Sequence, residues 1–336
     1  MNEPYDPAMP RLTAMDEMLV HQIPEPLPNV AVHHPHWRES VFYVVHHPDT
    51  PGDVLFLTMA SYPEREAMDS LQMGRVGGHQ IIGHQGRPYD GDPHTMTVGG
   101  VRIEVVTPFE EIRLWADPVE CAIGIDLTFR ARTQPYALRR GTMRAGHELI
   151  WDQSHLLQSG TYTGTYTVGG TTRSADGWWG QRDHSWGIRD HGRCPLWIWF
   201  QIQLPDGFLG VWHWELANGS RVYTDGCWAG ADGSDPIPLV DFQHAMEWVG
   251  GSYGHHGDAV SGLRGQCAFT LEGGRRIVVD AEGTFDRPYE PFQRGGLSQM
   301  RVRTDDGRSG TAVYEITGSH HHRYFPDTTP PGPLPG

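Results

Sequence analysis

The sequence contains no lysine: all 26 basic residues of the 336-residue chain are arginine. Without a lysine amine the chain has no Schiff-base chemistry, no lysine general base, no pyridoxal phosphate attachment and no Walker A phosphate loop. No Gly-x-Gly-x-x-Gly fingerprint opens a helix either, so we expect no nicotinamide cofactor and no other resident cofactor. The chemistry must come from other side chains.

Basic residues are outnumbered by acidic ones, 26 to 41, and the formal net charge is −15. The pairs Arg139-Arg140 and Arg275-Arg276 are too small to form a basic patch. Nucleic acids are bound largely through their phosphates, which attract basic surfaces. We therefore expect no nucleic-acid partner.

Cysteine pairs and apolar runs are missing as well. The four cysteines, at positions 121, 194, 227 and 267, form no C-x-x-C spacing, so we expect reduced, buried thiols and no cysteine zinc site. Met1–Leu12 has no apolar core of a signal peptide, and no run is long enough to span a membrane. We expect a cytoplasmic protein without a transmembrane segment.

Strand patterns fill most of the chain, which has 42 Gly and 26 Pro and little helical periodicity. Short β-branched and aromatic runs bounded by Gly, Asp, Asn and Pro predict strands, with hairpin turns at Leu204–Gly207, Glu272–Gly274 and Asp305–Gly307. One helix is predicted at Pro63–Gln72, because proline and acidic residues occupy its first turn. The predicted strands are Ser40–His46, Asp53–Met59, Val101–Val106, Ala122–Phe129, Gly160–Val168, Leu196–Gln203, Phe208–Glu215, Arg221–Trp228, Gln266–Leu271, Arg275–Ala281, Gln299–Arg303 and Thr311–Thr317.

Two halves are indicated by the spread of these strands and by a short repeat. Thr97–Gly100 and Thr167–Gly170 both read Thr-Val-Gly-Gly. We expect an all-β fold with domains at 1–154 and 155–327, followed by a Pro-rich tail at 328–336.

Tryptophan is concentrated in one region, since nine of the twelve tryptophans lie between positions 178 and 248. Strand alternation places Trp197 and Trp199 on one face, and Trp212 and Trp214 together on the next strand. Both faces of these strands are apolar, as in a barrel that is packed outside and lined inside. Tryptophans often fill cores, but this density predicts that some of them line a ligand cavity.

The segment Arg182–Asp190 opens this region and alternates charges and histidines around a Trp-Gly pair. Composition alone slightly favours a structural role, in which buried Arg–Asp pairs tie a loop to the barrel. On that interpretation, mutation of the segment lowers stability rather than ligand binding.

The string Gly180–Asp190, GQRDHSWGIRD, with the preceding Gln158–Gly170, resembles the carotenoid 1,2-hydratase-like family, which includes hydroxyneurosporene synthase and AttH-type proteins. The family's Asp-His-x-Trp-Gly core maps onto Asp183, His184, Trp186 and Gly187. The resemblance implies two lipocalin-like β domains in tandem. It also implies hydration of isoprenoid double bonds, although related folds include cyclases and lipid binders.

Hydration of an isolated alkene begins with protonation, and an apolar cavity keeps a carboxyl group protonated by raising its pKa. We therefore expect Asp183 as the acid or as the orienter of His184, with His184 as proton shuttle and Trp186 as a wall for the cation. Arg182 and Arg189 would lower the pKa of a nearby carboxyl group, which counts against Asp183 as donor. Further catalytic candidates are Glu215 and Asp225, with Glu315 in reserve. Expected substrate-binding residues are Trp186, Trp197, Trp199, Trp212, Trp214, Tyr223 and Trp228, and expected orienting residues are Arg182, Arg189 and Asp190.

The function predicted is a cofactor-independent hydratase or dehydratase of an apolar isoprenoid or polyene. A polyene cyclase or isomerase and a non-catalytic lipid or terpenoid carrier are the alternatives. Gly250–Gly254 matches G-x-S-x-G but lacks a following helix, so we expect no serine hydrolase. Histidine clusters at His33–His36, His46-His47, His255-His256 and His320–His322 are interpreted as surface histidines rather than metal ligands. The oligomeric state stays open.

Overall fold

The computed structural model describes residues 34–49, 52–90, 95–190, 196–216, 218–249, 262–284 and 296–317, together with Glu17, Leu19 and Arg193. Several sequence predictions lie outside the described residues. These are the N-terminal segment Met1–Leu12, Cys194, Gly250–Gly254, the histidines at 33, 255, 256 and 320–322, and the tail at 328–336.

The described chain is all-β and contains no α-helix, so the predicted fold class is confirmed. Every predicted strand overlaps an observed one, and the three predicted turns join successive strands. The first sheet consists of β1 (Trp37–His46), β2 (Val54–Tyr62), β3 (Ala67–Val76), β4 (His79–Pro88), β5 (Thr97–Val98), β6 (Val101–Thr107), β7 (Glu111–Ala116), β8 (Gly124–Ala131), β9 (Tyr136–Ala145), β10 (Glu148–Val168), β11 (Thr171–Ser174) and β12 (Trp178–Arg189).

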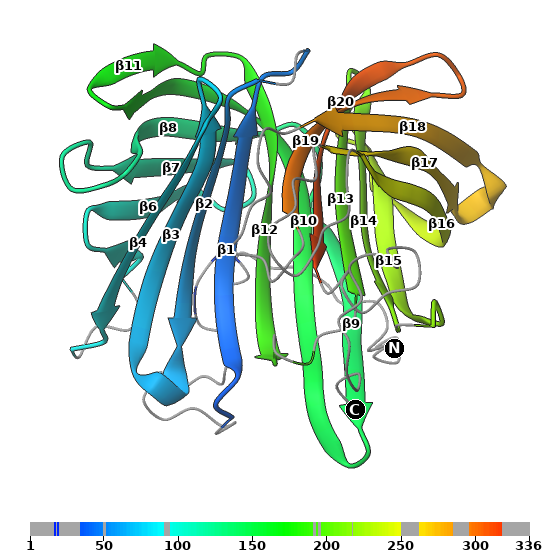
Figure 1. Ribbon diagram of the computed structural model, residues 1–336, viewed down its shortest axis with the longest axis horizontal. Coiled ribbons are helices and arrows are strands. Elements are labelled where there is room, and N and C mark those ends of the chain that lie inside the picture. Colours follow the sequence, from blue (N-terminus) through cyan, green and yellow to red (C-terminus); the bar gives the residue numbers. More distant parts are fainter. Residues whose placement is uncertain are drawn as a thin grey trace, which may run out of the picture.

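This first sheet runs in the order β4-β3-β2-β1-β12-β10-β8-β7-β6-β5, and it curls until its two ends nearly meet (Figure 1). At the closure, Gln85 on β4 donates a hydrogen bond to the Glu120 carbonyl and accepts one from the Gly100 amide. Apolar side chains such as Tyr43, Leu57 and Phe129 fill the concave interior.

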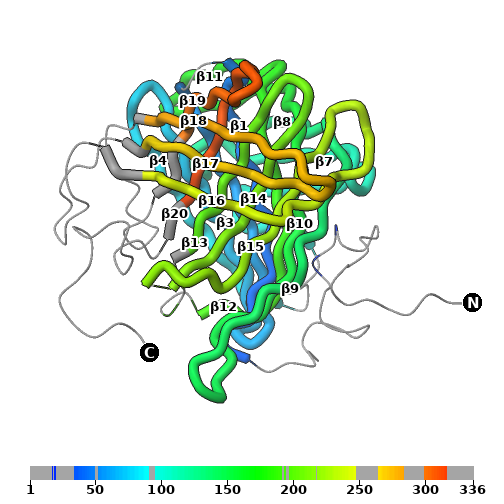
Figure 2. The backbone as a smooth tube through the Cα atoms, turned by 90° about the vertical axis from the view of Figure 1, so that its right-hand side faces the viewer, coloured from blue at the N-terminus to red at the C-terminus, as the bar shows by residue number. Residues whose placement is uncertain are grey.

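The second sheet is a closed barrel, seen from its side in Figure 2. Its interior is filled by apolar side chains from its strands, such as Phe200, Val211 and Phe269. The barrel strands in order are β13 (Leu196–Leu204), β14 (Gly207–Glu215), β15 (Arg221–Gly230), β16 (Ile237–Val249), β17 (Gly262–Leu271), β18 (Arg276–Thr284), β19 (Gly296–Thr304) and β20 (Ser309–Thr317).

The two sheets pack against each other through a third apolar cluster. Trp197, Trp199, Trp212 and Trp214 project from the outside of the barrel, and Trp151 on β10 packs on Trp197 and Trp214. The alternation predicted for β13 and β14 is therefore present. The tryptophans, however, lie on the outer face of the barrel, because its interior is taken by the aliphatic and phenylalanine side chains of the same strands.

The helix predicted at Pro63–Gln72 is wrong. Only Pro63–Arg65 forms a single 3-10 turn (η3), after which the chain continues as β3 in a hairpin with β2. Met68, Ser70 and Gln72 are buried in alternation, which is the period of a strand. The proline and the acids therefore mark a tight turn, and pairing with β2 overrides local helix propensity.

The segment Arg182–Asp190, interpreted as a possible clasping loop, is mostly strand. β12 lies between β1 and β10 in the first sheet, and nine of its twelve residues are buried. The boundary expected between 154 and 155 falls inside β10, and the chain passes from one sheet to the other between β12 and β13. The residues of the family-like motif thus belong to the first sheet.

Candidate functional site

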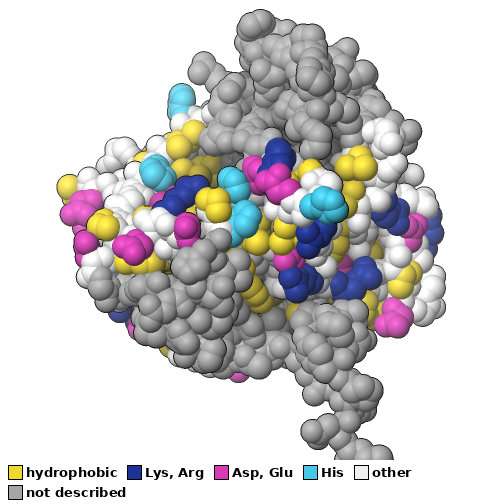
Figure 3. All heavy atoms as spheres, turned by 90° about the horizontal axis from the view of Figure 1, so that it is seen from below, with side chains coloured by type: hydrophobic (Ala, Val, Ile, Leu, Met, Phe, Trp, Pro, Cys, Tyr) yellow, Lys and Arg dark blue, Asp and Glu magenta, His cyan; other side chains and the backbone are white. Residues whose placement is uncertain are grey.

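A cavity of about 500 Å³ lies between the two sheets. This volume is within the range of small-molecule sites. Its lining includes residues from the first half of β1 and the second half of β12, the parts of these strands that are lower in Figure 1. The face of the molecule seen from below carries charged and histidine side chains among apolar ones (Figure 3). The lining residues are Pro35, His36, Arg38, Ser40, Phe42, Thr58, Tyr62, Arg65, Leu71, Met73, Trp151, His155, Asp183, Ser185, Arg189, Asp190, Trp197, Trp199, Trp212 and Glu315.

The barrel side of the cavity is aromatic. Trp197, Trp199 and Trp212 are at least nine-tenths buried and form its wall. The ring of Trp199 lies 5.7 Å from that of Phe42, which belongs to the opposite sheet. Such ring faces can hold an apolar ligand and attract a positive charge.

A carboxylate–imidazole pair faces this wall from the first sheet. His155 Nε2 lies 3.2 Å from Asp183 Oδ1, and the two side chains are 7% and 9% exposed. The strand register explains the contact, because Asp183 is opposite Leu157 and is therefore a diagonal neighbour of His155. The His155 ring meets the ring of Trp212 edge-on at 4.7 Å. A proton can therefore be held or exchanged beside an aromatic surface.

Two arginines flank the pair. Arg38 and Arg189 both donate hydrogen bonds to Ser40 Oγ, at 2.8 and 3.2 Å. Burial, followed by the nearby positive charge of Arg38, lowers the pKa of Arg189 to about 9. Arg189 Nε has no hydrogen-bond partner among the described residues. This end of the cavity is therefore polar and carries donors for an oxygen atom of a ligand.

Several predicted site residues do line this cavity. They are Asp183, Trp197, Trp199, Trp212, Arg189, Asp190 and the reserve candidate Glu315. They come from β12, the start of the following link, β13, β14 and β20. The remaining predicted residues lie elsewhere.

Three motif residues, Arg182, His184 and Trp186, occupy the opposite face of β12. Arg182 donates to Gln158 Oε1 at 3.0 Å and to Glu17 Oε1 at 2.5 Å inside the first sheet. His184 Nε2 lies 2.9 Å from Glu39 Oε1, and its ring packs on Trp186. Arg182 and His184 are buried and Trp186 is half-buried, and none of the three lines the cavity.

The other predicted residues on β14 and β15 also lie outside the cavity lining. Asp225 accepts hydrogen bonds from the Tyr136 hydroxyl and the Arg139 amide, which attach β9 to the barrel. Trp214 and Tyr223 pack on each other at 4.6 Å, and Trp228 lies beneath Arg275 and Arg308. Glu215 points into the barrel, where it contacts His213 and His244.

Sequence reasoning missed His155, the partner of Asp183. The usable signal was the alternation of Trp151, Gln153 and His155 along β10, which places polar groups on the face that carries Trp151. His155 stands at the expected domain boundary, outside the segment Arg182–Asp190 from which the site was predicted. Pairing of β10 with β12 is a long-range contact that no local pattern reveals.

Steric crowding explains why position 187 of the motif is glycine. Gly187 has φ +139°, and a Cβ atom there would lie 2.1 Å from the Asp152 carbonyl oxygen. Only glycine permits this close approach of β10 and β12. Gly187 pairs with Gln153, two pairs along the ladder from His155 and Ser185.

Solved structures with a similar fold exist. An AttH-like protein from Nitrosomonas europaea matches with a TM-score of 0.60 and 12% identity, over 88% of this chain and 99% of the other. Kievitone hydratase from Nectria haematococca matches with a TM-score of 0.53 and 15% identity, over 89% and 94% of the two chains. At these identities the likeness shows the fold. No curated protein matches the sequence.

In the described part of the chain, no helix is long and apolar enough to cross a membrane.

The family model described as "Family of unknown function (DUF8625)" matches residues 12–264, which is most of the chain. The protein therefore belongs to this family.

Proposed function

We propose that this protein is a cofactor-independent hydro-lyase that adds water to, or removes it from, a carbon–carbon double bond of an apolar small molecule. The observation that carries the proposal is the His155–Asp183 pair, which faces a tryptophan wall inside a cavity between the sheets. The fold likeness to a kievitone hydratase fits this reaction class. An isoprenoid or polyene chain is the substrate type that best suits the wall of Trp197, Trp199 and Trp212.

The reaction needs one mobile proton and one water molecule. The His155–Asp183 pair transfers its proton to one alkene carbon, and positive charge develops on the other carbon. The faces of the cavity tryptophans stabilise that charge. Water bonds to the cationic carbon and returns its surplus proton to the pair. The product is an alcohol, and dehydration is the same sequence in reverse.

The polar end of the cavity orients the reactants. Arg38, Arg189 and Ser40 present donors toward any oxygen atom on the substrate or toward the attacking water. The negative charge of Asp183 raises the pKa of Arg189 and so partly opposes the lowering caused by burial. These contacts position groups around the acid–base pair and do not themselves transfer a proton.

The test is incubation of the full chain with a panel of terpenoids and polyenes in H₂¹⁸O, followed by mass spectrometry. A product that gains one labelled water is expected. We expect Asp183→Asn and His155→Gln each to lower kcat/KM by about 10²–10⁴-fold. The matched control is His84→Gln, which removes an exposed imidazole 3.5 Å from Asp69 and should retain full activity.

Three outcomes would contradict the hydro-lyase. A mass-neutral isomer would indicate a cyclase or isomerase. A retained lipid that is never converted would indicate a carrier. Unchanged turnover in both Asp183→Asn and His155→Gln would place the chemistry elsewhere.

A further inference from the structure

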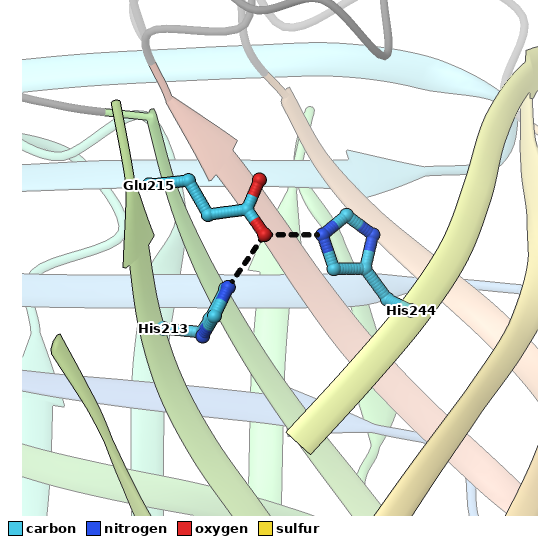
Figure 4. A group of neighbouring side chains, drawn as sticks. All are labelled: His213, Glu215 and His244. Carbon is cyan, nitrogen blue, oxygen red and sulfur yellow. Dashed lines mark hydrogen bonds and ion pairs between the residues drawn. The ribbon is translucent and has the colours of Figure 1, made fainter. Parts of the chain in front are cut away.

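A second group of histidines and a carboxylate lies inside the barrel and has no part in the proposed reaction. His213 Nε2 is 2.8 Å and His244 Nε2 is 3.3 Å from the same atom, Glu215 Oε1. All three possible ligand atoms lie within 4.8 Å of one another. Figure 4 shows the two rings pointing at the carboxylate from β14 and β16.

This group is separated from the cavity by the strand that carries it. His213 and Glu215 alternate along β14 with Trp212 and Trp214, which point outward to the other sheet. The three side chains are only 2%, 8% and 3% exposed. Phe242 packs against both imidazole rings. Burial to this extent would shield a metal ion there from bulk water.

The group also sits where the barrel is least completely paired. β15 and β16 are paired only at Cys227–Pro238 and Trp228–Ile237, so the later part of β16 leaves the β15 ladder. A register shift between Trp214 and Glu215 marks a bulge at the end of β14. Bulges often redirect a side chain next to a functional site. The convergence of Glu215 and His244 spans this open seam.

A third contact fixes which ring nitrogen points inward. His213 Nδ1 lies 2.6 Å from Thr224 Oγ1, which leaves Nε2 as the nitrogen that faces Glu215. Metal-binding histidines usually use their second nitrogen in a hydrogen bond of this kind. Two imidazoles and one carboxylate are a common donor set for zinc and other first-row divalent ions. Bonds of about 2.0–2.2 Å place such donors roughly 3–4 Å apart, a spacing that these side chains can reach by small rotations.

We propose that His213, Glu215 and His244 bind a divalent first-row transition metal, with zinc the best match, and that the ion ties β14 to β16 across the open seam. The site is structural and is independent of the proposed hydro-lyase activity. Without metal, the same three side chains form a hydrogen-bonded network, and the experiment distinguishes these two states.

The full chain is treated with a chelator, dialysed against Zn²⁺ or Co²⁺ and analysed for bound metal, in a background where His320–His322 are replaced by serine. One equivalent is expected, with a rise in Tm on zinc addition and the visible absorption of Co²⁺ held by the three side chains and one water molecule. His213→Asn, Glu215→Gln and His244→Asn should each weaken zinc binding at least tenfold. His84→Gln, which removes an exposed histidine, should leave it unchanged.

Thr224→Val keeps all three metal donors and removes only the hydroxyl group that contacts His213 Nδ1. We expect its zinc affinity to fall about 10–100-fold, as for other lost partners of metal-bound histidines. Circular dichroism establishes that each variant is folded. The proposal is overturned if the folded protein takes up no stoichiometric metal, or if uptake is the same in His213→Asn and His244→Asn as in the unsubstituted chain.

Discussion

Strand β12 carries a histidine–carboxylate pair on each of its faces, and the two pairs differ in what surrounds them. On one face Asp183 meets His155 at 3.2 Å, and on the other His184 meets Glu39 at 2.9 Å. Both contacts join diagonal neighbours on adjacent strands. The first pair borders a cavity, whereas the second is 0% and 1% exposed inside the first sheet.

The comparison shows that a chemically capable pair becomes a candidate site only where a ligand can reach it. The motif placed Asp183 and His184 next to each other in sequence, and strand geometry sends them to opposite faces. His155 takes the position beside Asp183 that the sequence interpretation gave to His184. We therefore expect mutation of the cavity pair to affect turnover and mutation of the enclosed pair to affect stability.

The largest stability effect is expected for Glu39→Ala. The substitution leaves the buried His184 ring without its carboxylate partner, and loss of one member of such a pair costs about 3–5 kcal/mol. Urea unfolding measures the change. Asp183→Asn is the contrasting variant: it keeps the shape of a side chain that borders the cavity, and its free energy of unfolding should change less than that of Glu39→Ala. If Glu39→Ala unfolds at the same urea concentration as the unsubstituted protein, the enclosed pair does not stabilise the fold and the expected difference between the two faces is wrong.

A buried histidine without a carboxylate sharpens the comparison. His46 ends β1, is fully buried and places Nδ1 3.0 Å from the His47 carbonyl oxygen, while Nε2 has no partner among the described residues. Burial lowers the pKa of His46 to about 4. In the unfolded chain it titrates near 6.5, so between these values the unfolded state binds more protons.

Stability should therefore fall as pH drops from about 6.5 to about 4, by about 3 kcal/mol from this group at the lower limit. Urea unfolding at a series of pH values, compared between the unsubstituted chain and His46→Gln, isolates the contribution. The difference between the two curves should change across this interval and be constant above pH 7. A constant difference throughout would show that folding does not change the pKa of His46 and would contradict the prediction.

The smallest effect is expected for the cavity wall. Trp199→Phe keeps an aromatic ring but removes contact area, which costs about 1 kcal/mol of substrate binding, or a KM about fivefold higher. Steady-state kinetics with a substrate from the panel measures it. Trp115→Phe on β7 is the matched control, because Trp115 is 44% exposed and far from the cavity lining. Equal changes in KM for the two substitutions would show that Trp199 does not contact the substrate.

Much of the architecture was predictable from local pattern. Alternating β-branched and aromatic residues predicted every strand of the closed barrel except β16, and Gly-containing turns predicted the hairpins β13–β14, β17–β18 and β19–β20. The clustered tryptophans predicted a cavity, and three of them line one. The helix at Pro63–Gln72 failed because a proline and acids at a turn look the same whether a helix or a hairpin follows.

The sequence by itself determined the all-β class, the alternation of each strand and the exclusion of lysine chemistry, since these depend on residue type and on a period of two. Only the tertiary structure decided which faces meet. The cavity pair depends on the register of β10 against β12, and the group of His213, Glu215 and His244 depends on β16 leaving β15. Such contacts join residues far apart in the chain, and their free energy comes from packing that no short segment contains.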